Sequence, residues 1–369
     1  MPPLRVTSEI GSLESVLVHS PGLELQAVTP GTREDYLYDD LLDLENAQQE
    51  HADFVAVLKR VTMVHEVSEL LTGLLAEREP REFLIARTMD VVASDVLGQR
   101  LGALPPDMFV KMLIEGVEEE SGLIARALNE AGYVFPPLPN LFFPRDIGMV
   151  LGEHVVVGSM RYDARWSEEL LIKTLFRFHP ELRNAGFLYD GSEERRNNYT
   201  LEGGDVHIPR ADLLIVGFSE RSSPAALDQL CEVVFARTAI TDVIVVVMPK
   251  EPTAIHLDML YSQIDRDLCI VYPPYFIGPE RRAVLHRRKG MESVREMPNF
   301  FAALQAVSMP LEPVFAGGTH RPTQEREQWS SACNFLAVKP GVIIGYKRNE
   351  GTLEALQEVG FDDMEAEDF

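Results

Sequence analysis

Residues 201–207, Leu-Glu-Gly-Gly-Asp-Val-His, carry side chains suited to binding a cation. Glu202 and Asp205 flank a pair of glycines, where an irregular loop of residues 190–200 gives way to a predicted strand. Glycine allows the backbone to adopt a positive φ or to approach a ligand closely. A flat cationic substrate could therefore bind beside the two acids. The alternative interpretation of this stretch is a turn with two solvated acids. The other motifs of the chain decide between a binding site and such a turn.

Two further polar clusters lie near predicted strand ends. One contains Asn140 and ends with Arg145 and Asp146, and the other contains His256 and Asp258. Taken singly, Arg145 and Asp146 could form a local ion pair, and His256 could be a histidine of the core. Because the three clusters occupy matching positions in repeated units of the chain, we interpret them together as one site.

The residue types of these clusters suit a planar cation. Paired carboxylates bind a guanidinium through charge-assisted, bidentate hydrogen bonds, and a histidine beside a carboxylate exchanges protons near neutral pH. Arg165 and Arg221 could bind a substrate carboxylate, while Phe143 could stack on the guanidinium plane. These features favour an amino acid with a planar cationic end. A metal site is the weaker alternative, since one histidine with several acids lacks compact ligand spacing.

A repeated pattern is expected to position these residues. Each unit has a strand, a tight turn, a second strand, a Gly followed by an Arg, and a helix. The strands are predicted at residues 149–151 and 154–157, 205–208 and 213–216, and 334–338 and 342–344, with helices at 164–178, 224–236 and 352–359. A fourth, more degenerate unit covers residues 256–272, with its turn at 265–267. Such units cannot bury their apolar faces singly, so we expect an α/β ring whose strand ends converge on the centre.

The N-terminal part is expected to have a different organisation. Strands are predicted at residues 15–19 and 63–67, and apolar residues at helical spacing predict an amphipathic helix at 42–61. Between residues 68 and 135 strand signals are absent, and helices are predicted at 70–76, 81–88, 93–101, 106–115 and 122–131. We therefore predict a first module at 1–67, a helical insertion at 68–135 and the remaining modules at 136–369.

Composition limits the possible partners and location. The 34 basic and 58 acidic residues give a net charge of -24, which disfavours nucleic acid and anionic lipid as partners. The sequence has neither a window of about 18 apolar residues nor a signal-peptide pattern, so we expect a cytoplasmic protein without a membrane segment. Cys231, Cys269 and Cys333 lack metal-ligand spacing and are too few for a disulfide framework, in agreement with a reducing compartment.

Several of these motifs, in this order, resemble the arginine deiminase family of the guanidine-modifying (amidinotransferase) superfamily. The resemblance covers almost the whole chain and is carried by residues 6–13, 139–146, 201–205, 217–221, 256–258 and 334–352. It implies a five-bladed, pseudo-symmetric α/β propeller, the pentein fold, with an inserted helical domain. It also implies hydrolysis of the small molecule L-arginine to L-citrulline and ammonia without a metal or organic cofactor.

The resemblance implies a role for each candidate residue. His256 would be the general acid and base, with Glu202 orienting it, and Asp146 and Asp258 would bind the guanidinium nitrogens. The amino acid end would be bound by Asn140, Arg165 and Arg221, and the pocket would be lined by Phe143 and Asp205. Pro144 stands where the family often has Thr, and we expect this change to be tolerated.

The family's cysteine nucleophile has no evident counterpart here. In the family a cysteine thiolate attacks the guanidinium carbon, and it lies in a Gly-rich loop downstream of the module at 334–359. The sequence given stops at Phe369, before such a loop, and Gly317-Gly318-Thr319-His320 is followed by Arg321 instead of Cys. Cys231 and Cys269 are expected to be buried and inert, which leaves Cys333 as the remaining candidate for a substitute.

Three interpretations remain open at this stage. In the first, the sequence is a C-terminally truncated copy of a working deiminase. In the second, it is a non-catalytic arginine-binding or structural relative, whose uncovered strand edge could be covered by homo-oligomerisation. In the third, it is an amidinotransferase-type enzyme acting on another guanidino substrate. We expect the first, because an incomplete last module would leave an apolar seam exposed.

Overall fold

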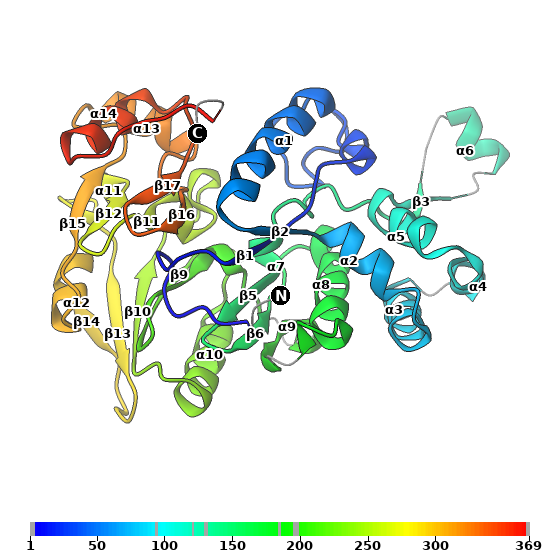
Figure 1. The fold of residues 1–369 in the computed structure, drawn as a ribbon, viewed down its shortest axis with the longest axis horizontal. Coiled ribbons are helices and arrows are strands. Elements are labelled where there is room, and N and C mark those ends of the chain that lie inside the picture. Colours follow the sequence, from blue (N-terminus) through cyan, green and yellow to red (C-terminus); the bar gives the residue numbers. More distant parts are fainter. Residues whose placement is uncertain are drawn as a thin grey trace. The chain divides into compact units, whose positions relative to one another are not determined.

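The computed structural model describes residues 4–92, 95–119, 122–128, 132–183, 186–194 and 199–366 (Figure 1). The predicted helices at 93–101 and 122–131 and the predicted loop at 190–200 therefore lie partly outside the described residues. Internal contacts divide the chain into two compact units. Unit 1 contains Glu14–Gly148 and Tyr162–Gly186, and unit 2 contains Leu4–Leu13, Met149–Arg161 and Phe187–Phe369.

Unit 1 begins with a pair of parallel strands joined by a long helix. Strand β1 (Ser15–Val18) pairs with β2 (Met63–Glu66), and α1 (Leu44–Val61) connects them. This confirms the strands and the helix predicted for this part. The helix begins two residues later than predicted because the Asp43 carboxylate accepts a hydrogen bond from the Asn46 backbone N–H at 2.8 Å and so acts as its N-cap.

The next part of unit 1 is mainly helical, as predicted. Its helices are α2 (Val67–Leu74), α3 (Arg78–Val91), α4 (Asp95–Ala103), α5 (Pro106–Glu115) and α6 (Leu123–Leu128). Helix α8 (Trp166–Phe178) follows β6 (His154–Val157) in the chain and packs against α2 and α3. Leu71, Leu84 and Leu113 are among the side chains buried in these helices.

The prediction that residues 68–135 contain no strand was wrong. Strands β3 (Val117–Glu118) and β4 (Tyr133–Phe135) form a short antiparallel pair. Segments of two and three residues are too short to show an alternating pattern, so sequence periodicity could not reveal them.

Unit 2 contains the predicted hairpins and additional strands. One sheet has the order β5-β6-β7, a second has the order β14-β13-β10-β9-β8, a third has the order β11-β12-β15, and a fourth pairs β16 with β17. Their bounds are β5 Gly148–Leu151, β6 His154–Val157, β7 Phe187–Asp190, β8 Val206–Arg210, β9 Leu213–Phe218, β10 Asp242–Val247, β11 Tyr261–Gln263, β12 Leu268–Val271, β13 Val284–Arg288, β14 Arg295–Met297, β15 Glu312–Phe315, β16 Leu336–Lys339 and β17 Val342–Ile344.

The repeated unit is larger than the hairpin and helix predicted from the sequence. In the second unit, β8 and β9 are antiparallel, and helix α10 (Pro224–Arg237) leads from β9 to β10, which is parallel to β9. Parallel third strands also follow the hairpins β5-β6 and β11-β12, namely β7 and β15. Such strands read as short apolar runs, which periodicity does not distinguish from buried helix segments.

The core of unit 2 lies on both faces of the β8–β10 region. Leu213 and Ile215 belong to one buried cluster, whereas Leu214 and Val216, at the alternating positions of the same strand, belong to another. Successive side chains of a strand point to opposite faces. Strand β9 is therefore buried on both sides. Its end is a rigid support for the loop that follows it.

The last part of unit 2 explains the Gly317-Gly318-Thr319-His320 segment. It forms the turn between β15 and α13 (Arg321–Trp329), with φ of 72° at Gly317 and 67° at Gly318. The Gly317 N–H donates to Thr352 Oγ1 at 2.8 Å, in α14 (Glu350–Glu358). Figure 1 shows α13 and α14 side by side, and their contact accounts for this segment as a structural turn.

Among the described residues, no helix is both long enough and apolar enough to span a membrane.

A buried histidine ties the elements of unit 1 together. The ring of His19, which follows β1, contacts Glu66 at the end of β2 through Nδ1 (3.1 Å) and Glu24 through Nε2 (3.3 Å). Burial by itself lowers the pKa of His19, but the hydrogen bonds to Glu24 and Glu66 outweigh it and raise the pKa to about 9. An imidazolium between two carboxylates is thus the favoured state.

The raised pKa of His19 predicts that unit 1 loses stability at alkaline pH. Because the folded state binds the proton more tightly, the stabilisation is complete below pH 6.5 and is lost as pH rises to about 9. The loss is on the order of 3 kcal/mol, at 1.36 kcal/mol per pKa unit. Urea denaturation on either side of this window should show the difference for the wild type and not for His19→Gln. His65→Gln, in the neighbouring β2, is the control and should keep the wild-type pH dependence. If His19→Gln lost as much unfolding free energy across this pH range as the wild type, the role given to His19 would be contradicted.

Candidate active site

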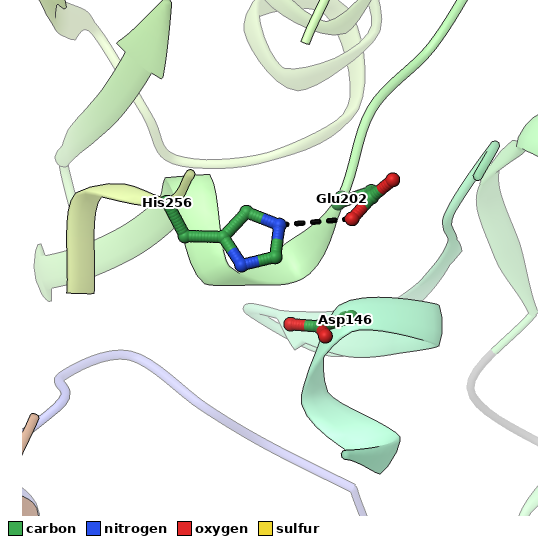
Figure 2. A group of neighbouring side chains, drawn as sticks. All are labelled: Asp146, Glu202 and His256. Atoms are coloured by element: carbon green, nitrogen blue, oxygen red, sulfur yellow. Dashed lines mark hydrogen bonds and ion pairs between the residues drawn. The ribbon is translucent and has the colours of Figure 1, made fainter. Parts of the chain in front are cut away.

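The carboxylate of Glu202 is the centre of a polar cluster in unit 2. Glu202 has no exposed surface, and its Oε1 accepts a hydrogen bond from the Arg161 backbone N–H at 2.9 Å. Its Oε2 lies 2.9 Å from His256 Nε2 and 3.0 Å from Arg221 Nη1 (Figure 2 shows the contact with His256). We call Glu202, Asp205, Arg221 and His256 the Glu202 cluster. A carboxylate hydrogen-bonded to a ring nitrogen is the arrangement needed to orient a proton-transferring histidine.

The second glycine of the motif, Gly204, is required by packing. Residues Gly203–Asp205 form a 3-10 helix, and neither glycine is among the described residues with positive φ. A Cβ atom on Gly204 would lie 2.6 Å from His256 Cγ. The expected approach to a ligand stays a prediction, and the group that lies against Gly204 here is the ring of His256.

Asp205 lies on the same 3-10 helix and is also fully buried. Its Oδ2 accepts hydrogen bonds from the hydroxyls of Ser219 (2.5 Å) and Ser222 (2.6 Å), and its Oδ1 accepts from the Leu257 backbone N–H (3.0 Å). Burial raises the pKa of Asp205 to about 6, although His256 and the two serine hydroxyls act in the opposite direction.

The predicted residues Arg221 and Asp258 occupy loops that adjoin this cluster. Arg221 is buried, and besides Glu202 it contacts Glu220 Oε1 through Nε at 3.3 Å. Asp258 lies two residues after His256, in the short 3-10 helix Leu257–Met259, and is half-buried.

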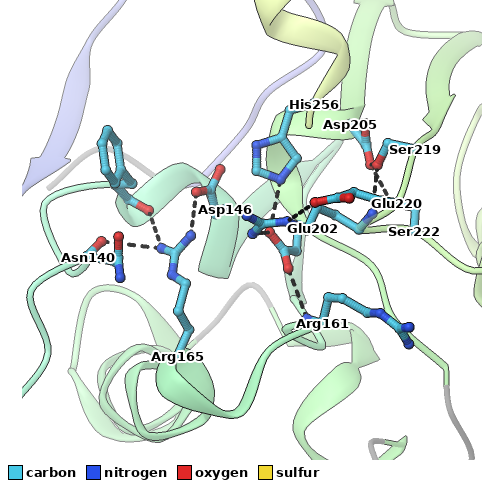
Figure 3. Close-up of polar contacts among 12 residues, drawn as sticks. Asn140, Asp146, Arg161, Arg165, Glu202, Asp205, Ser219, Glu220, Ser222 and His256 are labelled. Atoms are coloured by element: carbon cyan, nitrogen blue, oxygen red, sulfur yellow. Dashed lines mark hydrogen bonds and ion pairs between the residues drawn. The ribbon is translucent and has the colours of Figure 1, made fainter. Parts of the chain in front are cut away.

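The other predicted residues form a second cluster, in unit 1. The guanidinium of Arg165 donates to Asp146 Oδ2 at 2.6 Å and to Glu168 Oε2 at 2.9 Å, and it also donates to the backbone carbonyls of Asn140 (3.2 Å) and Phe143 (3.4 Å). Figure 3 shows the contacts of Arg165 with Asp146 and with the Asn140 carbonyl. We call Asn140, Phe143, Asp146 and Arg165 the Arg165 cluster.

Local structure explains how the Arg165 cluster is held. Asp146 lies in the single-turn helix α7 (Pro144–Ile147), and the side-chain N–H of Asn140 donates to the Tyr36 carbonyl at 2.9 Å. The 3-10 turn Asp163–Arg165 precedes α8 and replaces the first residues of the predicted helix. Phe143 keeps 46% of its surface exposed, and its ring packs on Phe142 with the ring centroids 4.1 Å apart.

Sequence reasoning missed several polar partners of these residues. Ser219 lies within the motif at residues 217–221, and Ser222 directly follows that motif. Glu168 lies three residues after Arg165, at helical spacing. The spacing of Glu168 was a usable signal, because residues three apart on a helix are neighbours. The bond from the Arg161 backbone to Glu202 had no sequence signal.

The three cysteines lie outside both clusters and are buried. Burial raises the pKa of the Cys231 thiol to about 11 and raises the pKa of Cys269 and Cys333 further above its usual range. Cys333 has no exposed surface and belongs to the apolar core of unit 2. A thiolate nucleophile needs a lowered pKa and access to its substrate, and these thiols have neither.

The packing of Gly204 against His256 generates a stability prediction. Gly204→Ala forces a Cβ into the imidazole ring and should lower the free energy of unfolding by about 1–3 kcal/mol. The control is Gly73→Ala on α2, where the structure leaves open space and alanine favours the helix. Chemical denaturation of both variants measures the difference; equal stability of Gly204→Ala and wild type would show that the ring does not pack as described.

Comparison with known proteins places these features in a family. The family described as arginine deiminase matches residues 34–366. An arginine deiminase of Rhodococcus erythropolis is 31% identical over 378 residues, which cover 98% of this chain and 91% of that protein. An arginine deiminase of Metamycoplasma arthritidis is 30% identical over 376 residues, covering 97% of this chain and 90% of that protein.

Solved structures share the fold at lower identity. SxtG, an amidinotransferase from Microseira wollei, superposes with a TM-score of 0.56 at 14% identity, covering 98% of this chain and 90% of that one. The product-bound N-terminal domain of ArgZ, a cyanobacterial arginine dihydrolase, gives a TM-score of 0.51 at 14% identity, covering 95% and 89%. These likenesses show a mixed α/β fold of the amidinotransferase type. Together with the family match, they establish that this chain belongs to the arginine deiminase family.

Proposed function

We propose that this chain binds L-arginine and supplies the residues that bind the guanidinium group and transfer protons in its hydrolysis to L-citrulline and ammonia. The observation that carries the proposal is the hydrogen bond between the buried Glu202 carboxylate and His256 Nε2, at 2.9 Å, in a chain of the arginine deiminase family. It is further supported by relatives that are themselves named arginine deiminases.

The proposed reaction assigns a task to each cluster. His256 transfers protons: it gives one to the leaving ammonia and takes one from the water that hydrolyses the amidino intermediate. Glu202 orients the His256 ring and compensates its positive charge. Asp146 and Asp258 bind the guanidinium nitrogens, and Phe143 and Asn140 contribute to the pocket.

Arg165 and Arg221 are proposed to bind the substrate carboxylate. Each is buried and already paired with an acid of the chain, Asp146 and Glu202 respectively. A guanidinium offers five N–H donors in a fixed plane, so these ion pairs set the orientation of the plane before a ligand arrives.

The attacking thiolate is the remaining requirement of the reaction. The intermediate forms when a cysteine sulfur bonds to the guanidinium carbon and ammonia leaves with the proton from His256. Because Cys231, Cys269 and Cys333 are buried with raised thiol pKa, we propose that the nucleophile comes from outside residues 1–369. The same burial favours a second candidate for this chain alone, an arginine-binding protein without turnover.

The architecture proposed for the whole chain is the five-bladed α/β propeller with residues 68–135 as an inserted helical domain. Its support is the repeated hairpin followed by a parallel strand, found in the sheets β5-β6-β7, β8-β9-β10 and β11-β12-β15. The free thiols of the three cysteines suit a cytoplasmic location.

Ligand binding tests the substrate proposed for this chain. We expect calorimetry to show that L-arginine binds residues 1–369 and that agmatine, which lacks the carboxylate, binds about 10–100-fold more weakly because charge-assisted hydrogen bonds are lost. Asp258→Asn should weaken both ligands, whereas the control Asp267→Asn, at an exposed turn, should weaken neither. Equal affinity for the two ligands would contradict a carboxylate-binding role for the arginines.

Citrulline formation tests the assignment of the nucleophile. We expect residues 1–369 to form no citrulline above background, because their three thiols are buried and have a raised pKa. Cys333→Ala should not change this result, and Cys269→Ala serves as a control of equal burial. Turnover by residues 1–369 would overturn the assignment, whether it survives Cys333→Ala or is abolished by it.

A further inference from the structure

Asp205 occupies an unusual position for a residue expected to line a substrate pocket. Its side chain is fully buried, and both of its oxygens accept hydrogen bonds from groups of the chain. A Cβ on Gly217 would lie 2.4 Å from Asp205 Oδ1, so the end of β9 closes against the carboxylate. These contacts direct its polar atoms towards the chain itself.

The donors to Asp205 Oδ2 lie on the loop that carries Arg221. Ser219 and Ser222 stand on either side of Arg221, and their hydroxyls converge on the one oxygen (Figure 3). Ser219 Oγ in turn accepts a hydrogen bond from the Arg221 backbone N–H at 2.9 Å. The backbone that presents Arg221 is thus held on both sides by the carboxylate.

The donor to Asp205 Oδ1 lies on the loop that carries His256. Leu257, whose N–H makes this bond, directly follows His256 and begins the 3-10 helix Leu257–Met259. The ring of His256 packs on Gly204, the residue before Asp205. The same carboxylate therefore also fixes the backbone beside His256.

These two loops carry the two side chains that meet at Glu202 Oε2. His256 Nε2 and Arg221 Nη1 lie 2.9 and 3.0 Å from this atom. Glu202 and Asp205 are joined by one short turn, in which the Asp205 N–H donates to the Glu202 carbonyl at 3.1 Å. The Glu202 carboxylate thus binds one side chain from each loop, and the Asp205 carboxylate binds two serine hydroxyls of one loop and a backbone N–H of the other.

We propose that Asp205 is a positioning residue, which sets where His256 and Arg221 meet Glu202 by fixing the backbone of both loops, and that it does not contact the substrate. The importance of this arrangement for arginine rests on the proposed function, but the arrangement itself is a property of the unliganded chain.

The first test reads the His256 ring without any ligand. Nitrogen-15 NMR of the histidine rings reports the tautomer and hydrogen bond of His256, with its signals assigned by their loss in His256→Gln. In Asp205→Ala we expect the ring signals of His256 to move to the values of an imidazole without the Glu202 hydrogen bond. Asp242→Ala, which removes a buried acid paired with His286 at 2.8 Å in the same unit, is the control and should leave the His256 signals in place.

A second variant separates the two loops and remains useful if Asp205→Ala does not fold. The double variant Ser219→Ala/Ser222→Ala removes the bonds to the Arg221 loop and keeps the bond to Leu257. We expect it to retain the His256 signals. Binding of L-arginine should weaken about tenfold, because Arg221 is coupled to these serines through one hydrogen-bond network. Asp205→Asn, which keeps one acceptor oxygen for Leu257, should likewise retain the His256 signals.

The outcomes distinguish this proposal from the proposed function. Unchanged His256 signals in a folded Asp205→Ala variant would overturn the positioning role. Weaker binding of L-arginine by Asp205→Ala with an unchanged His256 spectrum would confine the effect of Asp205 to the Arg221 loop, and would overturn the proposal that it positions both loops. If the wild-type chain does not bind L-arginine, the proposed function fails, while the NMR comparison still tests the role of Asp205.

Discussion

Burial of the Glu202 carboxylate is the constraint on which the rest of the candidate site depends. An ionised carboxylate removed from water costs several kcal/mol unless hydrogen bonds and opposite charge compensate it. In this protein the compensation comes from the Arg161 backbone, the Arg221 guanidinium and the His256 ring. Because these groups belong to three segments far apart in the sequence, satisfying Glu202 also fixes the loops after β6 and β9 and the loop that carries His256.

Close packing reinforces these polar bonds. The sites of Gly204 and Gly217 leave no room for a Cβ beside His256 and Asp205, so a small residue is needed at each for the charged groups to approach one another. Short 3-10 helices contain Asp205 and Asp258 and directly follow Glu202 and His256, while β9, buried on both faces, precedes the loop of Arg221. A site built in this way is organised before a ligand binds.

The Arg165 cluster follows the same physical rule with the charges exchanged. Here the buried group is a guanidinium, and Asp146, Glu168 and two backbone carbonyls satisfy it. In both clusters an arginine neutralises an acid that the proposed reaction needs. The ion pairs therefore hold the acids in place although removing their charges from water costs several kcal/mol.

The sequence by itself determined the elements that depend on neighbouring residues. The periodic apolar residues of α1, the tight turns of the hairpins and the order of the motifs were all readable, because helix periodicity and turn chemistry are local. The same motifs identified the acids, the histidine and the arginines as candidates.

Only the tertiary structure decided which partners these residues have. The pairing of β3 with β4, the parallel strands β7, β10 and β15, and the bonds from Ser219 and Ser222 to Asp205 all join residues that no local pattern links. The fold also decided that the Arg165 guanidinium pairs with Asp146 and that Cys333 is buried. The physical reason is that burial and hydrogen bonding are satisfied between segments distant in the chain, so the partner of a polar residue becomes defined only once the segments pack.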